Sequence, residues 1–81
     1  MAKSLQAARY RPLPAMLRQM REDAGLTQRD LAKKLKLSHT MVHNSEVAER
    51  RVDVMEFMDW ASACNVDPEV AFSKLRQHRN I

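Results

Sequence analysis

The side chains most able to do chemistry lie close together in the middle of this 81-residue chain. His39 and His43 are four residues apart, a spacing that places both on one helical face and can bind zinc. Zinc needs at least three protein ligands, whereas the only cysteine, Cys64, falls on an apolar helical stripe typical of core. No nucleophile motif or phosphate-binding glycine loop occurs, because Gly25 is the only glycine. The sequence therefore predicts no metal site, no cofactor and no enzyme.

The composition limits the chain to one small domain. A chain of this length can bury a single compact core. Fourteen Lys and Arg against ten Asp and Glu give a net charge of +4, which favours a polyanionic partner only weakly, since solvated basic faces are common. A single cysteine is typical of a reducing compartment, and no signal-peptide core or membrane-spanning run occurs. We expect a cytoplasmic protein with no membrane partner.

Helix start and stop signals divide the chain into five expected helices, with no strand pattern. Residues 1–11 are expected to form a flexible basic arm, and residues 12–78 one all-α domain. Gly25 is expected to end the first helix in a left-handed conformation, and Asn65 to end the fourth. The helices are expected to begin near Pro12, Thr27 (with Asp30 completing a capping box), Ser38, Asp53 and Asp67. The second and third helices are too short to stand alone and are joined by a tight turn, which indicates a helix-turn-helix.

A resemblance to a known family is carried by the run GLTQRDLAKKL from Gly25 to Leu35, followed by Leu37-Ser38 and by Val42 and Glu46. These residues resemble the Cro/C1-type repressor domains of the XRE family. The later run ERRVDVMEF, residues 49–57, is similar to a common bacterial and phage branch of that family. The resemblance covers residues 13–75 and implies a five-helix, lambda-repressor-like fold. It also implies that the third helix enters the DNA major groove.

The same resemblance implies that this third helix reads bases. By family position the readers are His39, Thr40 and Asn44, with His43 beside them; the alternative is an ordinary solvated polar face. Asn can pair with adenine through two hydrogen bonds, Thr can contact a thymine methyl group, and His can donate to guanine.

Contacts to the DNA backbone are expected from helix N-termini and nearby cations. Gln28 lies where its amide and adjacent backbone N–H groups can hold a phosphate, and in the family this Gln also braces the first reader; the alternative is a capping role alone. Lys36 stands in a turn where Gly is frequent, and Arg51 has an alternative pairing with Asp53 or Glu56. The expected backbone contacts are Thr27, Gln28, Lys36, Ser38, Arg50 and Arg51.

Two further pairs of residues have expected structural roles, one within the chain and one between two copies of it. The resemblance implies an Arg21–Glu46 pair that links the first helix to the third and orients the recognition helix. Met55 and Trp60 are candidates for an exposed dimer interface, because Met and aromatic residues are enriched there. Packing of Trp60 within the chain, against the fifth helix, is the equal alternative.

The chain departs from the family pattern at the end of the recognition helix. Ser45 stands where a large apolar residue is usual, at an expected loss of about 1–3 kcal/mol, with Met41 or Phe57 to fill the space. Val47 and Ala48 stand where Arg or Asn and then Gly are usual. The phosphate contact that normally follows this helix is therefore not expected.

With the resemblance, the sequence predicts a homodimeric repressor of a palindromic operator in double-stranded DNA, with half-sites roughly 34 Å apart. One alternative is an antitoxin that represses its own operon and binds a small protein partner, the toxin. Another is a protein–protein adaptor that does not bind DNA.

Overall fold

The computed structural model describes residues 7–79, and within that range the chain folds into five helices with no strand. The helices are α2 (Pro12–Asp23), α3 (Gln28–Leu35), α4 (His39–Glu46), α5 (Val54–Ala63) and α6 (Pro68–Arg79). The five-helix, all-α prediction is confirmed. Most of the expected basic arm, residues 1–6, lies outside the described residues, whereas residues 7–11 form hydrogen-bonded turns that lead into α2.

Side-chain caps explain where the short helices begin. The side chains of Thr27, Ser38 and Asp53 accept hydrogen bonds from the backbone N–H three residues on, at 3.0, 3.1 and 2.8 Å. Asp30 returns the bond to the Thr27 N–H at 3.0 Å, which completes the predicted capping box. Each cap satisfies a donor that the first helical turn leaves without a partner. The predicted starts of α3, α4 and α5 are confirmed.

Left-handed residues end the helices and redirect the chain. Gly25 (φ 73°) and Asn65 (φ 61°) adopt the conformation expected of them. Lys36 (φ 58°) and Ala48 (φ 64°) adopt it as well, although both carry side chains that disfavour it. Left-handed backbone costs a residue with a Cβ about 1–2 kcal/mol. The turns after α3 and α4 therefore use the left-handed geometry that favours glycine, with Lys36 and Ala48 in place of one.

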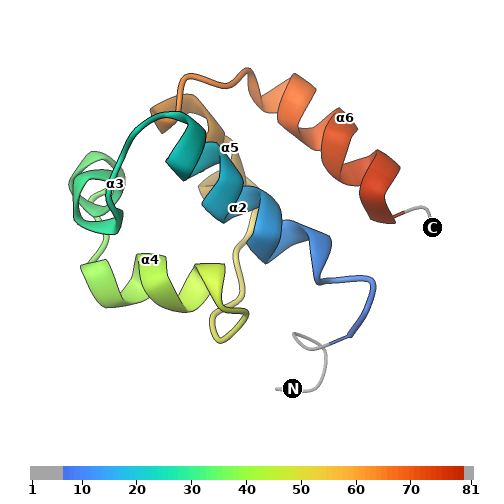
Figure 1. The fold of residues 1–81 in the computed structure, drawn as a ribbon, viewed down its shortest axis with the longest axis horizontal. Helices are drawn as coiled ribbons and strands as arrows, with labels where there is room; N and C mark the ends of the chain where they lie inside the picture. Colours follow the sequence, from blue (N-terminus) through green and yellow to red (C-terminus); the bar gives the residue numbers. More distant parts are fainter. Residues whose placement is uncertain (1–6, 80–81) are drawn as a thin grey trace.

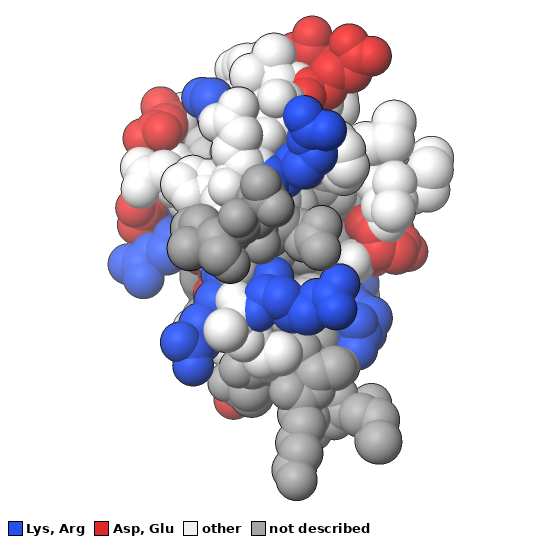
Figure 2. Space-filling model, turned by 90° about the vertical axis from the view of Figure 1, so that its right-hand side faces the viewer, with Lys and Arg blue, Asp and Glu red and all other residues white. Residues whose placement is uncertain are grey.

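Figure 1 shows how this order of helices leaves α4 accessible. α3 and α4 lie together on one side, α2 and α5 occupy the middle, and α6 closes the opposite side by packing on α5 and α2. Figure 2 shows the molecule from the α6 side, where Lys and Arg are interspersed with acidic and neutral residues. Positive charge is thus not confined to the α4 side, and net charge alone could not locate the site.

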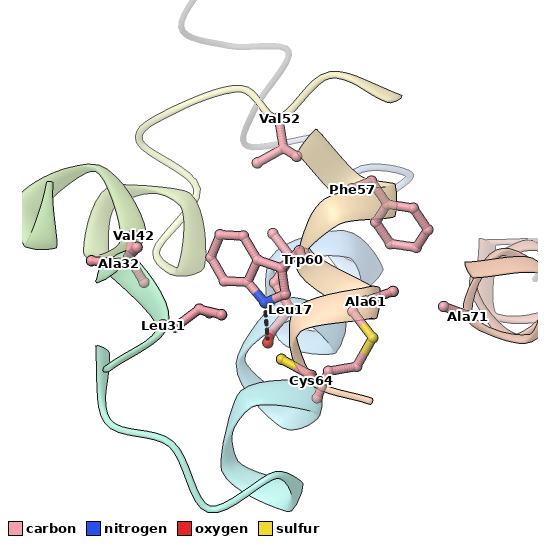
Figure 3. Close-up of a cluster of buried hydrophobic side chains, with 11 residues drawn as sticks. Leu17, Leu31, Ala32, Val42, Val52, Phe57, Trp60, Ala61, Cys64 and Ala71 are labelled. Carbon is pink, nitrogen blue, oxygen red and sulfur yellow. Dashed lines mark hydrogen bonds between the residues drawn. The ribbon is translucent and has the colours of Figure 1, made fainter. Parts of the chain in front are cut away.

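The core is built around Trp60, whose side chain is 0% exposed. Its indole N–H donates to the carbonyl of Leu17 at 3.0 Å, which ties α5 to α2 (Figure 3). Leu31 and Val42, both 0% exposed, bring α3 and α4 into the same cluster. A buried indole is stable only when its N–H has an acceptor, and the helix carbonyl supplies one.

The expectation that Trp60 forms an exposed dimer interface is wrong. Trp60 lies on the inward stripe of α5 with Phe57 and Ala61, and Cys64 continues this stripe at the C-cap; all four are buried. The opposite face of α5 carries Met55, which is 65% exposed. Met55 is therefore the member of that pair that remains accessible.

Candidate nucleic-acid interface

One helix carries all the residues expected to read bases. These residues are His39, Thr40, His43 and Asn44 of α4. The first three are exposed and Asn44 is half-buried. The other side of α4 is buried through Val42, Ser45 and Glu46, which hold the helix against the core. The arrangement presents hydrogen-bonding groups outward from a helix that is fixed from behind.

Arg21 and Glu46 form the main connection between α2 and the buried side of α4. The Arg21 Nε lies 2.6 Å from Glu46 Oε2 and its Nη2 lies 3.0 Å from Oε1. Its Nη1 donates to the carbonyl of Leu26 at 2.9 Å, so the same guanidinium also holds the turn before α3. The hydrogen bond to Glu46 raises the pKa of Arg21 above its ordinary value, against the opposing effect of burial. The guanidinium stays charged, and the pair joins α2 to the buried side of α4.

Gln28, the first residue of α3, connects this ion pair to the outer face of α4. Its Nε2 donates to Glu46 Oε1 at 3.0 Å and lies 3.4 Å from His43 Nδ1. Its Oε1 lies 3.1 Å from His39 Nε2. The half-buried amide is thus engaged within the chain by three side chains, which favours a bracing role over a direct contact to phosphate.

Arg50, expected to contact phosphate, has its guanidinium engaged within the chain. Its Nη1 and Nη2 donate to the two Glu56 carboxylate oxygens at 3.1 and 2.6 Å, and Nη1 also donates to Ser45 Oγ at 3.1 Å. A guanidinium used in this way braces the loop between α4 and α5 and is poorly placed to bind phosphate. Glu56, one of the two acids proposed above as partners of Arg51, is bound by Arg50.

This network also accounts for Ser45, which is 0% exposed where an apolar residue is usual. Its hydroxyl donates to the carbonyl of Met41 at 2.8 Å and accepts from Arg50. A buried hydroxyl with both partners carries little penalty, so polar contacts replace the apolar filling that the sequence suggested. The sequence feature that could have indicated these contacts is a Ser at an apolar position, Ser45, together with the nearby opposite charges of Arg50 and Glu56.

Four of the expected phosphate contacts are at exposed positions. Thr27 and Ser38 cap α3 and α4, and Lys36 and Arg51 lie in the adjoining loops. The cap oxygens of Thr27 and Ser38 accept backbone N–H bonds from the first turns of α3 and α4. Helix N-termini attract anions through free N–H groups and the helix dipole. These residues remain predicted contacts.

Other chemistry finds little support in the described part of the chain. Across residues 7–79, no three His, Cys, Asp or Glu side chains gather closely enough to hold a metal ion. In the same range, no helix is both long and apolar enough to cross a bilayer. Cys64 is a core residue, as expected, and burial raises the pKa of its thiol.

Comparisons with known proteins agree with this geometry. The helix-turn-helix domain family matches residues 13–71. A solved structure, an XRE-family like protein from Pseudomonas syringae pv. tomato str. DC3000, is 41% identical, with 94% of this chain and 93% of that chain covered and a TM-score of 0.82. The comparison with curated proteins found no match. The family is typically non-enzymatic. The chain therefore belongs to the XRE family of helix-turn-helix proteins and is a DNA-binding domain of the kind found in transcriptional regulators.

Proposed function

We propose that the protein is a transcriptional repressor that binds a palindromic operator as a homodimer, with α4 in the major groove. The observation that carries this proposal is the polar outer face of α4, which is joined to the core through the Arg21–Glu46 pair and contacted by Gln28. A helix that is already fixed loses little conformational freedom on binding, so more of the contact energy appears as affinity. Repression follows from occupancy, because a dimer over a promoter excludes other proteins.

The division of labour on DNA follows from side-chain chemistry. Asn44 pairs with adenine, and Thr40 contacts thymine or donates a hydrogen bond. Thr27, Ser38, Lys36 and the exposed Arg51 flank α4 and contact phosphates, which set position but not sequence. One helix of this length reads few base pairs, and two-fold symmetry doubles the number read.

The dimer surface that we propose includes the outer face of α5. Val54 and Met55 are 73% and 65% exposed, and Met58 is 41% exposed. We expect Met55→Lys to shift the protein from dimer to monomer in sedimentation, with Gln77→Lys, an exposed change on α6 and outside the face of α5 that we propose, as its control. An unchanged dimer in Met55→Lys would exclude this face.

The function itself is tested by selecting bound sequences from a random duplex pool with purified protein. We expect a palindromic consensus with half-sites roughly 34 Å apart. Asn44→Ala should weaken binding to the selected site by about 1–3 kcal/mol and leave binding to random DNA unchanged. Gln77→Ala, an exposed change on α6, should alter neither. No enrichment over random DNA would refute the proposal and favour the adaptor alternative.

A further inference from the structure

The hydrogen bonds around Gln28 have one consistent direction, which starts at Arg21. Arginine stays protonated in proteins, so Arg21 only donates, and the Glu46 carboxylate that it binds only accepts. The Gln28 atom that lies 3.0 Å from Glu46 Oε1 must then be the amide nitrogen. Rotation of the amide by half a turn would bring its carbonyl against the carboxylate. The Gln28 carbonyl therefore points toward His39.

This direction determines which nitrogen of His39 carries hydrogen. His39 Nε2 lies 3.1 Å from the Gln28 carbonyl oxygen, which only accepts, so Nε2 carries the hydrogen. In a neutral imidazole the other nitrogen, Nδ1, is then a bare acceptor. Because His39 is exposed and its Nε2 is used by Gln28, Nδ1 is the ring nitrogen that can accept a hydrogen bond from a DNA base.

The opposite result follows for His43. The amide nitrogen of Gln28 has a second hydrogen, and His43 Nδ1 lies 3.4 Å from that nitrogen. Nδ1 therefore accepts, and in the neutral ring the hydrogen is on Nε2. His43 presents this N–H outward, one helical turn along α4 from the acceptor of His39.

We propose that the Arg21–Glu46–Gln28 chain makes the neutral histidines readers of opposite polarity, with His39 as an acceptor and His43 as a donor. This inference rests on the proposed function and deepens it. An acceptor in the major groove selects the exocyclic amino group of adenine or cytosine. A donor selects N7 or O6 of guanine, N7 of adenine, or O4 of thymine. His39 therefore disfavours guanine, the partner that a histidine is usually given.

Base analogues test the polarity directly, at about pH 8, where an ordinary histidine is neutral. In the selected operator, each adenine or cytosine is replaced in turn by the analogue that lacks the exocyclic amino group, and each purine by its 7-deaza analogue. Affinities are measured for the native protein and for His39→Ala and His43→Ala. Coupling between a residue and a base group is the part of the loss that disappears in the alanine variant.

We expect His39 to couple to one amino-group deletion by about 2- to 12-fold, the range of one hydrogen bond, and to no 7-deaza substitution. His43 should show no coupling to amino-group deletions. In the Gln28→Met background the coupling between His39 and the base should disappear, whereas Asn44→Ala should still weaken binding to the operator. Gln19→Met is the matched control, because Gln19 also donates to a carboxylate, Asp23, but on the exposed side of α2.

Coupling of His39 to a 7-deaza purine, or to no base at all, would overturn the inference and leave the proposed function standing. Persistence of the His39 coupling in a folded Gln28→Met variant would overturn the role of Gln28. If no operator is selected, the proposed function fails and the inference fails with it.

Discussion

The ion pair between Arg21 and Glu46 allows the sharpest prediction of stability. The Glu46 side chain is 2% exposed and that of Arg21 11%. Glu46→Ala therefore leaves a largely buried guanidinium with the Leu26 carbonyl and, at 3.9 Å, the Glu22 carboxylate, which Arg18 already binds at 3.0 Å. Loss of one partner of a buried pair costs about 3–5 kcal/mol. A domain of 81 residues has about 4–12 kcal/mol of stability in all, at about 0.05–0.15 kcal/mol per residue. The variant should lose a large share of its fold.

The assay is thermal unfolding followed by circular dichroism. At about 4–8 °C per kcal/mol for a domain of this size, the midpoint of Glu46→Ala should fall by about 12–40 °C. Arg18→Ala is the matched control, because Arg18 and Glu22 form an ion pair at 3.0 Å on the exposed face of the same helix. Exposed pairs contribute about 0.2–1 kcal/mol, so the control should shift little.

A third variant separates the unpaired charge from the lost contact. The double variant Arg21→Met, Glu46→Leu removes both charges and fills their space with apolar side chains of similar size. Such replacement of a buried ion pair often leaves the stability of the fold unchanged or raises it. We expect its midpoint to lie well above that of Glu46→Ala. A Glu46→Ala midpoint equal to that of Arg18→Ala would refute the reasoning, because the pair would then behave as an exposed one.

Three other changes test local features. Ala48→Gly should stabilise the fold by about 0.5–1 kcal/mol, since relief of left-handed strain exceeds the entropy that Gly adds to the unfolded chain; urea unfolding measures it, and destabilisation would contradict it. Hydrogen bonds from the backbone N–H and the hydroxyl group of Thr27 lower the pKa of Asp30. The stability that the Asp30 carboxylate contributes is therefore present above the unfolded pKa near 3.9 and is lost as pH falls through the lower folded pKa. The stability gap between native protein and Asp30→Ala should therefore close in acid, and a gap independent of pH would argue against this cause. Cys64 should be alkylated far more slowly in the native protein than in urea, since burial raises the pKa of its thiol and shields it, and equal rates would place it at the surface.

Features set by neighbouring residues were predictable from the sequence. The caps at Thr27, Ser38 and Asp53 and the left-handed Gly25 and Asn65 each depend on a few consecutive residues. The pairing of helices into a helix-turn-helix followed from their length and from the family resemblance.

Two features were not predictable, for different reasons. Helix α5 is apolar around most of its circumference, so its composition does not identify one buried face and does not decide whether Trp60 lies at the surface or in the core. The contact of Ser45 with Arg50 and Glu56 crosses the loop between α4 and α5. No periodic pattern reports a contact whose geometry depends on the path of a loop.

Trp60 gives the protein an internal optical reporter. It is the only tryptophan, it is 0% exposed, and its N–H is held by Leu17. Its fluorescence should lie at the short-wavelength end in the native state and move to longer wavelength when the core opens. Because it lies inside the core and away from the outer face of α4, DNA should leave its emission unchanged. Trp60 emission, recorded while operator DNA is added, can then report whether a variant that no longer binds the operator is still folded.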